Sequence, residues 1–379
     1  MNRRIYGIVL QLFVLAVVAC FILFLFNTTA TNLSRAGITT GFGFLNQPAG
    51  FDIGFSFLPY NSSDTYLKVF VIGALNTLFV SALSICICTV IGFVFGIAQL
   101  SENKLTVFMA KFYVETIRNI PLLLHVVFWY FIILNIFPSV SGSWSIFDLS
   151  YINKRGLYLP SFNFMLGTIG SICFVAFIII SVVLRIRNKR RYYQVTGKRK
   201  GVFLFVLLLT LASASILWLL GGMDVAIQLP EAGKFNISGG INIVPELFAL
   251  VIGLSLYHGA FVAEYVRAGL LSVDKGQVEA AHALGLTPWR TMREVIVPQA
   301  LRVIIPSYIN NNLNVFKNSS LGAAIAFPEL VNVFLGTSLN QTGNAVEIVL
   351  MAMLFYFTIS MIISLILNIY NRRVQIIER

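Results

Sequence analysis

Apolar runs alternate with short polar segments along the whole chain. Eight of these runs hold enough apolar residues to cross, or nearly to cross, the ~30 Å hydrocarbon layer of a membrane. They cover residues 5–26, 69–100, 122–137, 162–184, 202–223, 247–263, 303–316 and 348–371. Only helices and closed barrels satisfy their backbone groups in lipid, and the alternating segments of a barrel are not found here. The pattern therefore predicts an all-α integral membrane protein with about eight transmembrane helices.

The composition and the placement of charge support this class. Of the 379 residues, 58% are hydrophobic and 11% are charged, whereas soluble proteins carry about 25% charged residues. The formal net charge of +12 suggests nucleic-acid binding at first. However, most Lys and Arg lie in segments that alternating spans place on one side, above all in residues 185–200. The positive-inside rule then predicts an N-in and C-in topology, with the lipid bilayer and no nucleic acid as partner.

The cysteines give no sign of a metal site. Cys20, Cys86, Cys88 and Cys173 all lie in apolar runs, where cysteine behaves as a small apolar residue. Cys86 and Cys88 are two positions apart, so on a helix their side chains point away from one another. We therefore predict neither a bound metal nor a disulfide.

A long basic gap between two apolar runs, residues 269–299, has the pattern of two short helices. Gly276 and Gly285 bracket the first, and Gly285 is placed to end it in the left-handed conformation. Thr287 and Pro288 are typical of the cap and first residue of a second helix. The first helix carries small side chains, and a carboxylate near its start, at Glu279, Ala280, Ala281 and Ala283. On the inner side of a membrane this predicts a docking helix for another protein, with an ordinary helical loop as the alternative.

The same loop resembles a known motif. Glu279-Ala280-Ala281, Gly285 and Pro298 are spaced as in the cytoplasmic EAA motif of permease subunits of binding-protein-dependent ABC importers. Val295 and Val297 stand where that family has Ile and Leu, which is a conservative change. Further segments resemble the polar amino acid branch of the family: Asn76–Leu78, Glu115–Leu122, Glu264–Gly269, Lys275–Gln277, Pro298–Arg302, Pro306, Asn311 and Lys317–Leu321.

The resemblance implies a type I ABC importer permease, similar to the methionine importers. The second, third, sixth, seventh and eighth expected helices would form its core, and residues 41–53 are similar to the general L-amino-acid branch. The chain would form half of a translocation path for L-amino acids and would couple to a separate ATPase. The coupling residues would be Gly276, Gln277, Glu279, Ala280, Ala281, Gly285 and Pro298.

The implied partners are ABC ATPase subunits, a second homologous permease subunit, a periplasmic amino acid binding protein and an L-amino acid substrate. This chain would bind no cofactor, since ATP and Mg would lie on the partner ATPase. The expected location is the bacterial cell inner membrane, crossed several times. The chain would have an extra helix and periplasmic loop (1–66), two core helices (67–138), inserted loops with two extra helices (139–243) and three core helices with the loop 269–299 (244–379).

Charged side chains at membrane depth cost about 2.5–3.5 kcal/mol each on insertion scales, so they need a reason. Glu264 and Arg267 are three residues apart near the inner end of the sixth expected helix. Glu115 and Arg118 have the same spacing before the third. This spacing is typical of structural ion pairs within one helix.

The seventh expected helix carries amides and an ammonium group. Asn310, Asn314 and Lys317 fall on one face, and Asn311 is adjacent to it. These groups could bind a zwitterionic substrate, so they are candidates for lining the translocation path. The alternative is hydrogen bonding between helices. For His125 and His258, which lie in apolar helices, we predict packing roles rather than a proton relay.

The source of energy separates the possible functions. The chain contains no Gly-x-x-x-x-Gly-Lys-Ser/Thr loop, so we predict a transport subunit without a nucleotide site, not an enzyme. The alternative is an ion-coupled secondary amino acid transporter, but the inverted repeats and broken helices usual in that class are not found. An integral-membrane enzyme would need clustered catalytic groups, and the acidic residues here are dispersed.

Overall fold

The computed structural model describes residues 3–35, 41–147, 149–166, 223–233 and 236–374. The chain divides into two compact units, one made of residues 1–136 and 244–379 and the other of Phe137–Ile243. The first unit is helical, and the described part of the second consists mainly of short strands. The fold is therefore mostly helical rather than all-α.

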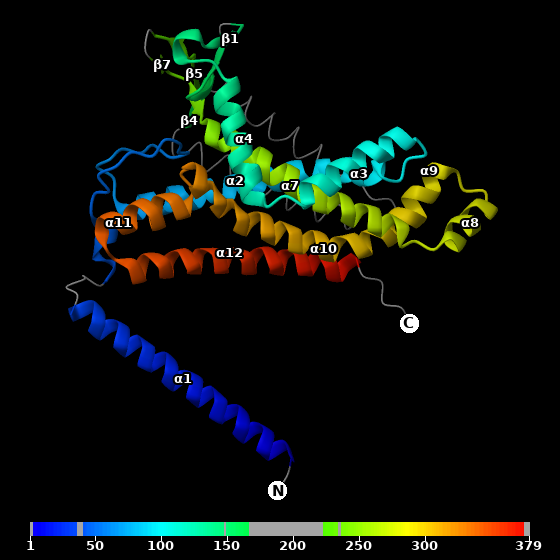
Figure 1. Cartoon of the computed structure of the whole chain (residues 1–379), viewed down its shortest axis with the longest axis horizontal. Helices are drawn as coiled ribbons and strands as arrows, with labels where there is room; N and C mark the ends of the chain where they lie inside the picture. Colours follow the sequence, from blue (N-terminus) through cyan, green and yellow to red (C-terminus); the bar gives the residue numbers. More distant parts are fainter. Residues whose placement is uncertain (1–2, 36–40, 148, 167–222, 234–235, 375–379) are drawn as a thin grey trace. The chain divides into compact units, whose positions relative to one another are not determined.

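The helical unit (Figure 1) contains long helices joined by short turns, 3-10 segments and two π-helical segments. Its long helices are α1 (Arg3–Arg35), α2 (Tyr66–Ala98), α3 (Lys104–Arg118), α4 (Leu122–Ile136), α7 (Pro245–Leu271), α10 (Val297–Asn318) and α12 (Ala345–Val374). Its short elements are η1 (Phe42–Asn46), α8 (Lys275–Ala283), α9 (Pro288–Thr291), η3 (Met292–Ile296), η4 (Ser319–Ile325), η5 (Val331–Ser338) and α11 (Leu339–Thr342).

Three described helices, α2, α7 and α12, are long and apolar enough to cross a membrane. The pair α3 and α4 counts as a fourth span if it is taken together, with a bend of 106° between the two helices. These spans coincide with the second, sixth, eighth and third apolar runs of the sequence. The first and seventh runs lie within α1 and α10.

The two remaining expected helices fall mostly outside the described residues. Where the structure describes their ends, it shows strands: β4 covers Ser161–Leu166 and β5 covers Met223–Gln228. The helix expected from residue 162 is therefore wrong in its first turn, since β4 pairs there with β5 in an antiparallel ladder from Ser161↔Gln228 to Leu166↔Met223. An apolar run alone does not separate a strand from a helix end.

Helix α7 lies at the centre of the helical bundle and contacts α2, α3, α4 and α10, while α10 also contacts α12. Glycines allow two of these approaches. A Cβ atom on Gly92 of α2 would lie 2.3 Å from Val262 of α7, and one on Gly269 of α7 would lie 2.4 Å from Ile304 of α10. The short helices α8 and α9 lie at the end of this bundle opposite α11 (Figure 1).

The segment before α2, residues 41–65, packs on the bundle rather than extending from it. Phe44 and Ala49 are buried in one apolar cluster with residues of α2, η5 and α12. The Asn76 side chain of α2 donates hydrogen bonds to the carbonyl oxygens of Phe55 (2.9 Å) and Pro328 (2.8 Å). One side chain thus ties this segment to α2 and to the turn before η5, so three parts of the chain are fixed together.

Where inserted loops were expected beside the two extra helices of residues 139–243, the second unit has strands. They form a four-stranded antiparallel sheet in the order β1 (Trp144–Ile146), β2 (Ser150–Asn153), β3 (Gly156–Leu159) and β8 (Ile241–Ile243). A smaller pair joins β6 (Glu231–Ala232) to β7 (Ile237–Ser238), and the short 3-10 turn η2 covers Val140–Gly142. The strands are two to six residues long and separated by Gly, Pro and Asn, so their alternation is too brief to stand out in the sequence.

Candidate functional site

Helix α8 is defined at both ends by local chemistry. Asp274 caps its start, since the side chain accepts a hydrogen bond from the Gly276 backbone N–H at 2.7 Å. At its end Gly285 has a φ of +75°. The N–H of Leu286 bonds to the Ala281 carbonyl at 3.1 Å, and the N–H of Gly285 bonds to the His282 carbonyl at 2.9 Å. This pair of bonds is the Schellman arrangement. The predicted glycine stop is confirmed, and Thr287 and Pro288 begin α9 as expected.

The exposed surface of α8 is small and polar, as predicted, with one correction. Gly276, Gln277, Glu279 and Ala280 are exposed, as are Gly285 and Pro298 beyond the helix. Ala281, in contrast, is buried against its own chain with 3% of its surface exposed. It packs α8 onto the loop and is not available to another backbone.

Sequence reasoning missed two large apolar side chains of this loop. Leu284 is 82% exposed and Trp289 is 71% exposed. The sequence could have indicated Leu284, because it directly precedes the glycine that ends α8 and therefore lies at the tip of the helix. Exposed apolar groups of this size on a polar loop are typical of a protein contact.

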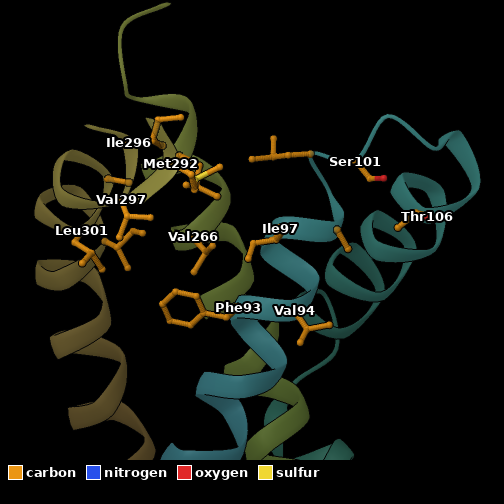
Figure 2. Close-up of a pocket in the computed structure, with 15 residues that line it drawn as sticks. Phe93, Val94, Ile97, Ser101, Thr106, Val266, Met292, Ile296, Val297 and Leu301 are labelled. Atoms are coloured by element: carbon orange, nitrogen blue, oxygen red, sulfur yellow. The ribbon is translucent and has the colours of Figure 1, made fainter. Parts of the chain in front are cut away.

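The loop joins the bundle beside an apolar cavity of about 780 Å³. Figure 2 shows side chains from α2, α7 and the start of α10 around it, among them Phe93, Val266 and Leu301. Helix α9 continues through the π-helical segment η3 into α10 without a break. Pro298 lies in the first turn of α10. The loop therefore leads directly into the helix that carries the amide groups.

Glu264 of α7 lies between two arginines. Its carboxylate forms an ion pair with Arg267 one turn along, with the Arg267 Nε at 3.1 Å from Oε1. The second arginine, Arg118 of α3, has its Nη1 4.0 Å from Oε2 of Glu264. The guanidinium of Arg118 also lies 5.0 Å from the centre of the Phe261 ring.

The expected pairing of Glu115 with Arg118 is therefore wrong. Arg118 reaches across to α7 for its carboxylate, and within the described chain Glu115 forms no ion pair. The backbone carbonyl of Glu115 instead accepts a hydrogen bond from the Asn119 side chain at 2.7 Å. A spacing of three residues permits an ion pair within one helix but does not exclude a better partner on another.

The bend between α3 and α4 is held by polar groups as well. The Nε2 atom of His125 lies 3.1 Å from the carbonyl oxygen of Ile117, so it donates across the bend. His125 is buried, with 5% of its surface exposed. This contact supplies the packing role predicted for it, because the last carbonyls of a helix have no partner within the helix.

Helix α10 separates the four predicted path residues into two groups. Asn310, Asn314 and Lys317 are exposed along one face. Asn311 is buried, and its Oδ1 lies 3.0 Å from Nδ1 of His258 on α7. Asn311 thus forms the hydrogen bond between helices that was the alternative reading, whereas the other three residues share an open face.

A cavity of about 500 Å³ lies beside Lys317. Ser320, Tyr356 and Ser360 give it hydroxyl groups, and Val331, Leu335 and Met353 are among its apolar walls. Behind it Glu329 is fully buried, with its carboxylate accepting hydrogen bonds from the backbone N–H groups of Val331 (2.8 Å) and Asn332 (2.9 Å). The Tyr356 hydroxyl lies 3.4 Å from the same carboxylate. Sequence reasoning did not single out Glu329 or Tyr356, because their roles depend on the turn between η4 and η5.

Within the described ranges, no three His, Cys, Asp or Glu side chains gather as metal ligands. The polar groups on the open face of α10 and in the cavity beside Lys317 are hydroxyls, amides and one ammonium, and the Glu329 carboxylate is buried behind them. Such a set can bind the carboxylate and ammonium groups of a small polar solute, since hydroxyls and amides both donate and accept.

Known proteins resemble this chain over almost its whole length. The family model described as "Binding-protein-dependent transport system inner membrane component" matches residues 88–376. The "Putative amino-acid ABC transporter permease protein YhdX" of Escherichia coli is 45% identical over 97% of this chain and 94% of its own. The "General L-amino acid transport system permease protein AapQ" of Rhizobium johnstonii is 40% identical over 97% of this chain and 92% of its own.

A third relative matches the chain from end to end. The "Glutamate/glutamine/aspartate/asparagine transport system permease protein BztB" of Rhodobacter capsulatus is 35% identical over 100% of this chain and 96% of its own. Because all three matches cover more than nine tenths of both chains, they include the helical unit and the inserted residues between α4 and α7.

Proposed function

Because this chain belongs to the family of binding-protein-dependent transport system inner membrane components, we propose that it forms half of the path by which an ATP-driven ABC importer moves L-amino acids. It is a permease subunit of the inner membrane and a transport component rather than an enzyme. The substrate class follows the names of the three relatives, all of them amino acid permeases.

The coupling site is the outer surface of α8. Gly276, Gln277, Glu279 and Ala280 form a small exposed face, and Gly285 ends the helix so that Leu284 projects from its tip. Leu284 and Trp289 add apolar area that an ATPase groove would bury. The unbroken run from α9 to α10 then carries a displacement of α8 toward the membrane. The exposed Schellman-ended α8 is the structural observation on which this part of the proposal rests.

The translocation path runs along the open face of α10. Asn310, Asn314 and Lys317 are exposed there, and the cavity beside Lys317 offers hydroxyl groups. A zwitterionic amino acid brings a carboxylate for the Lys317 ammonium and an ammonium group for amide oxygens. The assignment is supported by the exposure of these side chains, since polar groups at membrane depth otherwise face a partner helix.

The assembly around this subunit has two permeases, two ABC ATPase subunits and a periplasmic amino acid binding protein. Helices α2, α3 with α4, α7, α10 and α12 form the type I importer core, and α1 is an additional span outside that core. Both termini and α8 face the cytoplasm, as the Lys and Arg distribution favours. ATP and Mg are bound by the ATPase.

Uptake into membrane vesicles tests this function. We expect accumulation of radiolabelled glutamate or a related L-amino acid that requires both ATP and the soluble binding protein and that persists when ionophores collapse the ion gradients. Accumulation that follows a sodium or proton gradient without ATP would instead identify the ion-coupled secondary transporter.

A further inference from the structure

Two side chains of α10 are held by a single histidine of α7. His258 is buried, with 3% of its surface exposed. Its Nδ1 lies 3.0 Å from Oδ1 of Asn311, and its Nε2 lies 3.2 Å from Nδ2 of Asn318. An amide nitrogen can only donate, so Nε2 accepts from Asn318 and Nδ1 carries the proton that it donates to Asn311. The imidazole is therefore neutral, with both ring nitrogens bonded to the same neighbouring helix.

The two bonds define how α10 is rotated about its axis. Asn311 and Asn318 are seven residues apart, which is about 10 Å along a helix. At about 100° per residue they share one face, roughly 80° around the helix from the open face of Asn310, Asn314 and Lys317. Rotation of α10 about its axis would carry both amides away from the His258 ring, so it would break both hydrogen bonds together.

Apolar packing alone would specify this rotation poorly. Asn310, Asn311, Asn312 and Asn314 are nearly consecutive, so a turn of about 100° would replace one exposed amide by the next. In lipid the hydrophobic effect does little to determine which of these faces is buried. Close packing and hydrogen bonds between helices determine it instead. The close approach of Gly269 to Ile304 limits the separation of α7 and α10 but does not distinguish the amides.

We propose that His258 is a positioning residue, whose two hydrogen bonds to Asn311 and Asn318 hold α10 in the rotation that presents Asn310, Asn314 and Lys317 to the translocation path. His258 itself does not contact the substrate. The inference rests on the proposed function for the meaning of the open face, but the rotation can be measured without transport.

Thiol labelling measures this rotation directly. The full chain, with its four cysteines replaced by alanine, is studied in vesicles with its native partners. Asn314→Cys reports the open face and Val315→Cys reports a buried position. Labelling by a methanethiosulfonate reagent is compared in the presence of His258→Leu, which removes both bonds, and His258→Gln, whose amide can still donate and accept. His125→Leu is the matched control, since it removes a buried histidine bonded elsewhere.

We expect His258→Leu to slow labelling at Asn314→Cys by at least about fivefold and to speed it at Val315→Cys by a similar factor, as the loss of two hydrogen bonds between helices allows. His258→Gln and His125→Leu should leave both rates within about twofold. Unchanged rates in His258→Leu, or the same shift in His258→Gln, would overturn the positioning role. If His258→Leu fails to assemble, Asn318→Leu tests the same bond from α10 and should shift the rates in the same direction.

The outcome separates the two proposals. If the labelling shifts as expected while alanine at Asn314 and at Lys317 leaves uptake normal, His258 positions α10 but the open face is not the path. If those alanine variants abolish uptake while labelling is unchanged in His258→Leu, the path stands and the positioning role is wrong.

Discussion

Helix α8 and the C-terminal half of α10 are the two parts of this membrane protein richest in candidate functional groups, and they are built in opposite ways. The capping bonds of α8 come from residues within its own loop: Asp274 at the start, and the backbone of Gly285 and Leu286 at the end. In α10, by contrast, the amides of Asn311 and Asn318 are hydrogen-bonded to His258 on another helix. A docking helix that projects into water must carry its own structure, whereas a path-lining helix inherits its orientation from the bundle.

This difference predicts how each region responds to substitution. Changes in α8 should affect the partnership with the ATPase and leave the membrane bundle intact. Changes on the open face of α10 should stop the solute and leave the assembly intact. A substitution in α8 that stopped the solute without affecting the ATPase, or one on α10 that released the ATPase, would contradict this comparison.

The largest effect is expected on α10. Lys317→Ala and Asn314→Ala should lower uptake by at least about tenfold each, since a hydrogen bond to a charged group contributes roughly 1.5–3 kcal/mol. The ATPase should still co-purify with both variants. Uptake by vesicles and subunit ratios on a gel measure the two properties. Normal uptake by both variants would remove these residues from the path.

The next effect is expected at the end of α8. Gly285→Val places a β-branched residue at a φ of +75°, at a cost of about 1–2 kcal/mol, and should weaken co-purification of the ATPase. Gly343→Val is the matched control, because Gly343 has a φ of +72° and, like Gly285, open space around a built Cβ. It lies at the end of α11, at the other end of the bundle (Figure 1). Equal loss of the ATPase in both variants would mean that strain, not coupling, is measured.

A smaller effect is expected when the N-terminal cap of α8 is removed. Asp274→Ala removes the side chain that accepts the Gly276 N–H, which typically costs about 1 kcal/mol. Because α8 has nine residues and is marginal alone in water, ATPase affinity should fall by a few fold. Asp274→Asn keeps an acceptor and should restore it. A calorimetric titration of the ATPase onto the permease complex gives both values.

The smallest effect concerns pH and the segment before α2. Lys68 donates to Asp64 at 2.8 Å and holds the pKa of that carboxyl below its usual value of 3.8. A lowered pKa in the folded state stabilises the protein above the unfolded value, and that contribution is lost as the pH falls through the folded pKa. Thermal unfolding in detergent should therefore show a slightly smaller loss of stability below about pH 4 in Asp64→Asn than in the wild type. Equal acid sensitivity of the two proteins would show that this pair contributes nothing.

The sequence predicted best what is local. The stop at Gly285, the start of α9 at Thr287 and Pro288, and the exposed face of Gln277 and Glu279 depend only on neighbouring residues, and the structure confirms them. The Glu264–Arg267 pair is of the same kind. Capping and i,i+3 chemistry act within one turn, so a single sequence contains them.

What depends on two helices could not be predicted. Arg118 pairs with Glu264 across a helix interface, which no spacing within α3 reveals. Asn310 and Asn311 are the same residue type, and which of them is buried against His258 of α7 depends on how two helices pack. Among the strands of Phe137–Ile243, the neighbouring pairs are too short to stand out, and β3 pairs with β8 from a segment about ninety residues away, as in Leu157↔Ile243.

Reconstitution of the purified chain alone tests the central claim, that work reaches this subunit from a separate ATPase through α8. Liposomes that contain only this chain, with sodium and proton gradients imposed in turn, should not accumulate an L-amino acid above its outside concentration. Addition of the ATPase, the partner permease, the binding protein and ATP should restore accumulation. Concentrative uptake by the chain alone, driven by either gradient, would contradict the account.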